Sequence, residues 1–133
     1  MEESNKRFLT NGLAQIEKNL QDINKVLSQY EPKSLFSEMV DDIKPEDKAS
    51  LLNLVNRTID HIGQIKENFR LEQKSVKKSK YVIVQLSDAN MILDDLTPKN
   101  LGVYGKLDLA DSNLLESYLT EIRTMLKKIQ SLL

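Results

Sequence analysis

Apolar residues recur every three or four positions near both ends of the chain. The N-terminal stripe comprises Leu9, Leu13, Ile16, Leu20, Ile23, Leu27 and Tyr30, and the C-terminal stripe comprises Leu115, Tyr118, Ile122, Met125, Ile129 and Leu132. This spacing places each stripe on one face of an α-helix, because an α-helix has about 3.6 residues per turn. An apolar helix face is stable when it packs against other apolar surface. The pattern therefore predicts an all-α fold.

Proline residues divide the N-terminal half of the chain into helices. The first helix is expected over residues 3–29 and ends before Pro32, because proline cannot continue a helix. A short helix is expected over residues 33–43 and would close one end of a bundle. Its apolar residues, three and four positions apart, are Leu35, Phe36, Met39, Val40 and Ile43. Pro45 and the acidic residues after it are typical of a helix start, so a third helix is expected over residues 45–73.

The apolar pattern changes phase in the middle of the chain. The spacing of Phe69 and Val76 would place the next residues of the same helix face at positions 83 and 90. The apolar residues that follow are shifted from these positions by one: Val82, Leu86, Ala89, Leu93 and Leu96. We therefore expect the chain to reverse over residues 74–80 and a helix to follow over residues 76–96. An unbroken helix over residues 45–96 is the alternative, and so long a helix would need a partner chain.

The C-terminal part is expected to hold one long loop and one helix. Thr97 and Pro98 end the preceding helix, and a loop follows over residues 97–111. Either Asp108 or Asp111 can cap the last helix, which runs to the C-terminus.

These elements predict an antiparallel (up-down) four-helix bundle with one short additional helix, in a single domain over residues 1–133. The predicted core comprises Leu13, Leu20, Leu27, Val55, Ile62, Phe69, Leu86, Leu93, Tyr118, Ile122 and Ile129. Gly12 and Gly63 lie beside stripe residues, and a glycine inside a helix costs about 1 kcal/mol. Our hypothesis is that these glycines let two helices approach closely, so that leucine at either position would lower the melting temperature.

Composition excludes several classes of protein. The 133 residues include no cysteine, and 19 basic residues balance 20 acidic ones. No disulfide or thiolate site is therefore expected, and the lack of a basic excess argues against nucleic-acid binding. The longest apolar run, residues 81–84, is too short to span a membrane. The acidic, polar start is not typical of a signal peptide, so we expect a cytoplasmic protein.

His61 is the only histidine of the chain. It precedes the stripe residue Ile62 and is expected to be exposed. Histidine phosphotransfer domains place such an imidazole on the surface of a four-helix bundle, with lysine and then glycine soon after it. Here Gly63 precedes Lys66, so the motif departs from that pattern, and an ordinary surface histidine is the alternative. One histidine cannot supply the two Glu-x-x-His pairs of a di-iron bundle, so no metal or cofactor is expected.

Two segments are candidate interaction surfaces. A basic run comprises Lys74, Lys77, Lys78 and Lys80, and could contact nucleic acid, an anionic surface or an acidic partner. A solvated turn is the alternative for this run. The loop over residues 97–110 is long enough to suggest a function. Its apolar residues, which include Leu101, Val103, Tyr104 and Leu107, form either a lid over the core or an exposed patch.

No catalytic motif accompanies these segments. The sequence therefore favours a non-catalytic protein that acts through protein–protein interaction, as an adaptor, a chaperone-like protein or a regulatory partner. Self-association as a homodimer is compatible with the same stripes. Phosphotransfer through His61 and binding of anionic surfaces through the lysine run are the alternatives.

Overall fold

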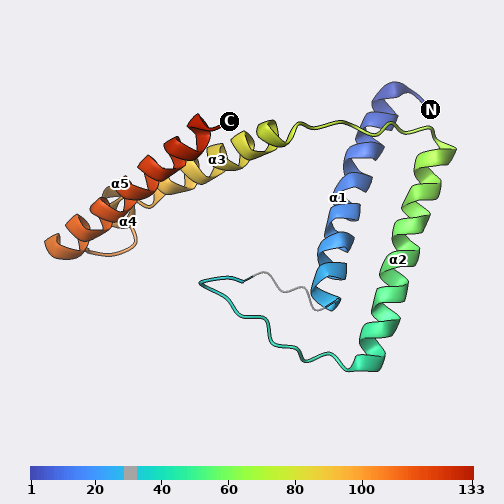
Figure 1. Ribbon diagram of the computed structural model, residues 1–133, viewed down its shortest axis with the longest axis horizontal. Helices are drawn as coiled ribbons and strands as arrows, with labels where there is room; N and C mark the ends of the chain where they lie inside the picture. The colour runs from blue at the N-terminus through green and yellow to red at the C-terminus, as the bar shows by residue number, and fades with distance from the viewer. Residues whose placement is uncertain (29–32) are drawn as a thin grey trace. The chain divides into compact units, whose positions relative to one another are not determined.

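The computed structural model describes residues 1–28 and 33–133, and in these ranges all regular secondary structure is helical. The helices are α1 (Glu3–Leu27), α2 (Pro45–Asn68), α3 (Lys78–Asp95), α4 (Pro98–Leu101) and α5 (Leu109–Ser131) (Figure 1). They belong to two units, Met1–Gln73 and Lys74–Leu133. The all-α prediction is confirmed. A single domain, and one bundle of four up-down helices, stay predictions.

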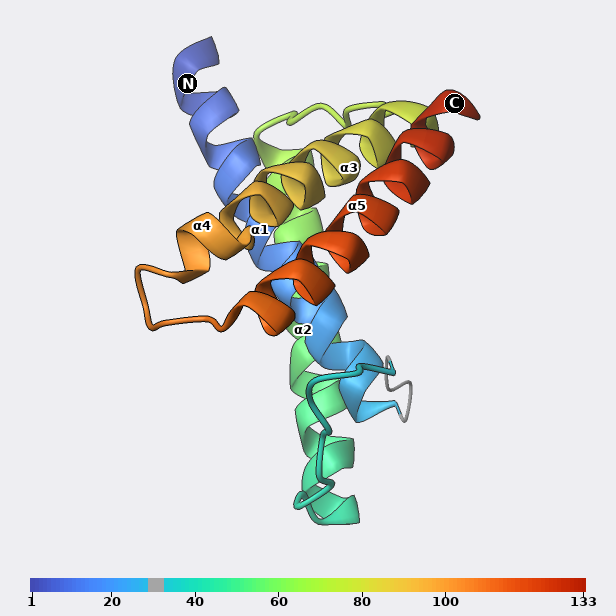
Figure 2. The ribbon, with the colours of Figure 1, turned by 90° about the vertical axis from the view of Figure 1, so that its left-hand side faces the viewer.

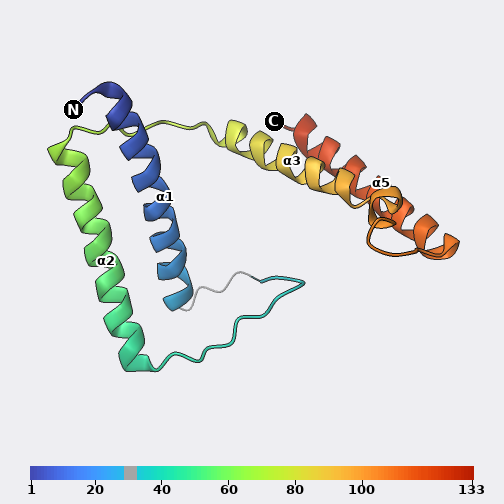
Figure 3. The same cartoon turned by 180° about the vertical axis from the view of Figure 1, so that it is seen from behind.

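The first unit is an antiparallel hairpin of α1 and α2, which lie side by side (Figures 1 and 3). Residues of the predicted α1 stripe are buried or half-buried along this contact: Leu9, Leu13, Leu20 and Leu27. The matching α2 residues are Leu52, Val55, Ile59, Ile62 and Ile65. Two stripe residues, Ile16 and Ile23, are nearly half exposed beside the contact. Tyr30 and Pro32 lie outside the described residues.

α2 ends at Asn68, five residues before the predicted end. The Leu71 amide donates to the Lys66 carbonyl oxygen at 2.9 Å, and the Arg70 amide donates to the Glu67 carbonyl oxygen at 3.2 Å. These two bonds form a Schellman motif, which requires a left-handed residue after the helix, and Arg70 has φ 52°. Leu71 is buried in the first unit. Glycine usually occupies the left-handed position, so the sequence carried no ordinary signal for this end.

Arg70→Gly should stabilise the first unit by about 0.5–1 kcal/mol, because a left-handed conformation is unfavourable for a residue with a Cβ atom. Urea unfolding followed by circular dichroism measures this change. Arg57→Gly, in the interior of α2, is the matched control and should destabilise by about 1 kcal/mol. If both variants lost the same free energy of unfolding, the Schellman motif at the end of α2 would be contradicted.

The short helix predicted over residues 33–43 is wrong, since the structure has no helix there. Side chains bond to the backbone instead: the Phe36 amide donates to Ser34 Oγ at 3.2 Å, and the Ile43 amide donates to Asp41 Oδ1 at 3.4 Å. Such local bonds compete with helix formation. A helix of this length is also marginal by itself, because nucleation is unfavourable and few propagating bonds follow it.

The hypothesis for Gly12 and Gly63 is also wrong. A Cβ atom built at either glycine would meet no described atom within 4 Å. Both residues are exposed within helices. They therefore carry the helix penalty of glycine without permitting a close approach.

Gly63→Ala should raise the unfolding free energy by about 0.5–1 kcal/mol, because alanine has the higher helix propensity and open space surrounds the new methyl group. Differential scanning calorimetry would record this as a higher melting temperature. A lower melting temperature would instead indicate that a neighbour packs against Gly63.

The second unit is built on an antiparallel pair, α3 and α5, with the short α4 against α5 (Figure 2). The break before α3 is confirmed, and the unbroken helix over residues 45–96 is wrong. Leu86 and Leu93 of α3 are buried, as predicted. Arg123 and Asp94 add an ion pair between the helices at 3.4 Å.

α5 packs on α3 through a row one position later than predicted. Leu119 is 4% exposed, whereas its neighbour Tyr118 is 58% exposed. Leu115 and Leu126 are half-buried in the same row as Leu119. The predicted core residues Tyr118, Ile122 and Ile129 are exposed, and so is Phe69 at the end of α2. The apolar pattern of α5 is wide enough to allow either row, and α3 lies over only one of them.

Candidate interaction surfaces

The predicted loop over residues 97–110 contains α4 and then a compact turn. Pro98 begins α4, and the Gly102 amide donates to the Pro98 carbonyl oxygen at 3.0 Å. The next turn is closed by a 3.0 Å bond from the Tyr104 amide to the Leu101 carbonyl oxygen. These bonds hold the backbone while the side chains of Val103 and Tyr104 stay 81% and 89% exposed.

Only part of this loop folds onto its own unit. Leu101 is half-buried and belongs to α4, which contacts α5. Leu107 is partly exposed, at 39%. Val103 and Tyr104 are almost fully exposed and cover no part of the second unit. Asp108 caps α5 by accepting the Asp111 amide at 2.7 Å, so of the two predicted caps Asp108 is the one used. Within the second unit the tip of the loop is therefore an exposed apolar patch and not a lid, and a lid over the core of the predicted four-helix bundle stays a prediction.

The predicted basic run lies at the start of α3. Lys74 is in the connector, Lys77 is the N-cap, and Lys78 and Lys80 are in the first turn. No acidic residue occupies that turn, and the Lys77 side chain makes no capping bond. Positive charge is unfavourable at a helix N-terminus, where the backbone amides already carry partial positive charge. The cluster thus weakens α3, and its use as an anion-binding surface stays a prediction.

Lys77→Asp should stabilise the second unit by about 1 kcal/mol, because aspartate can accept an amide bond at the N-cap and its charge favours the helix dipole. Thermal unfolding in low salt tests this. Lys74→Asp makes the same change of charge three residues earlier, where it cannot cap, and should have a smaller effect. An effect of equal size would assign the gain to net charge alone.

His61 lies on α2 and is exposed, as predicted. Phosphotransfer through it stays a prediction. Among the residues that the structure describes, no group of three or more His, Cys, Asp or Glu side chains could hold a metal ion. In the same residues, no helix is both long and apolar enough to cross a membrane.

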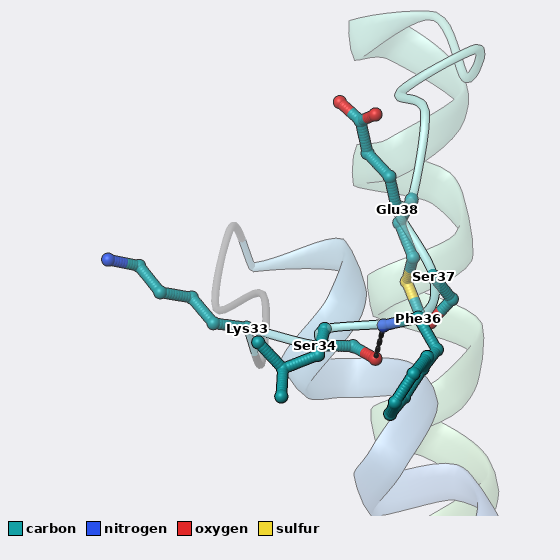
Figure 4. Close-up of a pocket in the computed structure, with 7 residues that line it drawn as sticks. Lys33, Ser34, Phe36, Ser37 and Glu38 are labelled. Carbon is teal, nitrogen blue, oxygen red and sulfur yellow. Dashed lines mark hydrogen bonds between the residues drawn. The ribbon is translucent and has the colours of Figure 1, made fainter. Parts of the chain in front are cut away.

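Residues 33–43 form an exposed apolar segment that the sequence analysis placed in a helix. Leu35 and Phe36 are 95% and 96% exposed, and Figure 4 shows Phe36 and Glu38 pointing away from each other. The C-terminal part of the segment is anchored, because Asp41 forms an ion pair and hydrogen bond with Lys48 at the start of α2. This bond lowers the pKa of the Asp41 carboxyl below its ordinary value. The sequence did contain a signal against a helix here, because the segment is a short span between Pro32 and Pro45.

A row of exposed apolar residues follows α5. Residues of the predicted stripe that α3 leaves exposed are Tyr118, Ile122, Met125, Ile129 and Leu132, with Leu114 beside them. They come from successive turns of one helix, so they form a continuous row. This row lies next to the buried Leu119 row, so α5 has two adjacent apolar faces, and α3 covers only one of them.

No protein-family model, curated protein or solved structure gives a significant match to this chain.

Proposed function

We propose that this protein acts by binding a protein partner, as an adaptor, a chaperone-like protein or a regulatory partner. The observation that supports the proposal is the exposed row on α5. Fully burying an exposed side chain of this size is worth about 1.5–3 kcal/mol, and Ile129 and Met125 still expose 44% and 55% of their surface to be covered. Contiguous apolar patches of this kind on a protein surface typically mark interaction sites.

α3 supports the same proposal. Apart from the residues that contact α5, it exposes Tyr81 and Ile92 on one flank and Val84 and Met91 on the other. A helix with apolar residues on most of its circumference is normally covered on several sides. Within the second unit, however, α5 is the only long helix that packs against it. The α3–α5 hairpin therefore offers binding surface on both of its long helices.

The predicted up-down bundle of four helices is the competing use of these faces, and we retain it as a proposal for the fold. If the two hairpins of one chain pack against each other, their exposed helix faces are buried within that chain and cannot bind a partner. Partner binding would then fall to two exposed apolar sites in loops. These are Leu35 and Phe36 in the 33–43 segment, and Val103 and Tyr104 after α4.

Photo-crosslinking in the cells that make the protein tests the proposal. A benzophenone amino acid is introduced separately at Tyr118, Tyr104 and Phe36, which sample the helix face and the two loops. Thr124, exposed on the polar side of α5, is the control. We expect a protein adduct from at least one apolar position and none from Thr124. No adduct from any of the three apolar positions would contradict a protein-binding function.

A further inference from the structure

The exposed row of α5 has the spacing of a coiled-coil seam. Steps of four and three alternate through the exposed residues Tyr118, Ile122, Met125, Ile129 and Leu132, and the spacing begins at Leu115, which is half-buried on the side that packs on α3. This heptad spacing fits a single partner helix that lies along α5. The flanks of the seam differ. Leu119 and Leu126 lie on the flank that packs on α3, whereas Glu121 and Lys128 lie on the opposite, exposed flank.

We propose that the partner of this seam is α5 of a second copy of the chain, packed antiparallel about a two-fold axis. The inference rests on the proposed function and names the partner. Packing Ile122 against Met125 of the second copy sets the register. The same register packs Tyr118 against Ile129 of the second copy, and the two-fold axis repeats each contact. Apolar residues then face apolar residues along the whole seam.

The charges on the exposed flank favour this direction. In an antiparallel pair the two exposed flanks lie on the same side, so Glu121 comes opposite Lys128 of the second copy, and symmetry repeats the ion pair. In a parallel pair each exposed flank would face the flank that α3 occupies, and Glu121 would lie toward Leu126. Charge flanking the seam sets orientation in coiled coils, so the antiparallel arrangement is the one selected.

The antiparallel arrangement also gives α3 a neighbour. It brings the two α3-covered flanks to one side of the α5 pair, so the two copies of α3 lie next to each other. Each then has apolar residues available for the contact, because Tyr81, Ile92 and Leu96 are exposed beside the row that meets α5. The result is a four-helix arrangement made from two α3–α5 hairpins, and it covers helix faces that one hairpin leaves exposed.

The test is the solution mass of the full chain, measured by light scattering on a sizing column across dilution. We expect a species of twice the 15.3 kDa chain mass that dissociates on dilution. Met125→Glu places a charge in the seam and should yield monomer. Thr124→Glu, on the neighbouring polar face, is the matched control and should remain dimeric. Circular dichroism checks that both variants keep their helical content.

The register is tested by exchanging charges. Glu121→Lys and Lys128→Glu should each weaken the dimer about tenfold, because two symmetric attractive pairs become repulsive. The double variant restores opposite charges and should recover most of the affinity. These exposed positions lie outside both apolar rows, so the experiment remains decisive even if Met125→Glu fails to fold.

Each outcome bears on the inference. A monomer at every concentration overturns it, as does a dimer that Met125→Glu leaves intact. A dimer that the double charge exchange fails to restore overturns the antiparallel register. If the chain is monomeric but position 118 crosslinks to a different protein, the inference fails and the proposed function stands. An adduct of twice the chain mass supports both.

Discussion

Each long helix in this chain has more apolar surface than its one antiparallel neighbour covers. In the first unit α1 buries Leu27 and half-buries Leu20 along α2 but leaves Ile16 and Ile23 partly exposed. In the second, α5 buries Leu119 and leaves Tyr118 exposed. A helix in a bundle normally has two neighbours, and a hairpin provides one. These partly exposed faces are the surfaces through which, in our proposal, the protein binds a partner.

The segments between the helices are shaped by local bonds. A Schellman motif around Arg70 ends α2, Asp108 caps α5, and Asp41 anchors the 33–43 segment to Lys48. The motif at Arg70 comes with a buried Leu71, whereas the bonds at Asp41 and Asp108 leave the apolar side chains of Phe36 and Tyr104 exposed. As a result, Phe36 and Tyr104 are presented on ordered backbone, and an exposed side chain loses less conformational entropy on binding when its backbone is already held.

The proposed function rests on the exposed apolar surface of the described residues. His61 is solitary on an exposed helix face, and the lysines at the start of α3 act against the helix dipole. The α5 seam combines three properties in one element: heptad spacing, exposure, and opposite charges one heptad apart on its free flank. Together they specify a partner helix and its direction, which neither loop does.

Periodicity by itself determined that the chain is helical, where α1 and α5 run, and which residues can face a neighbour. Proline at position 45 also determined where α2 begins, and the sequence limited the cap of α5 to Asp108 or Asp111, of which the structure uses Asp108. Only tertiary structure decided that Leu119 and not Tyr118 meets α3, because a wide apolar pattern does not specify the direction of the neighbour. It likewise decided that α2 ends at a left-handed Arg70 and that residues 33–43 form no helix. At the end of α2, two backbone bonds and the burial of Leu71 outweigh the preference of arginine for a right-handed conformation. In residues 33–43, bonds to the Ser34 and Asp41 side chains outweigh helix propensities that differ by about 1 kcal/mol or less.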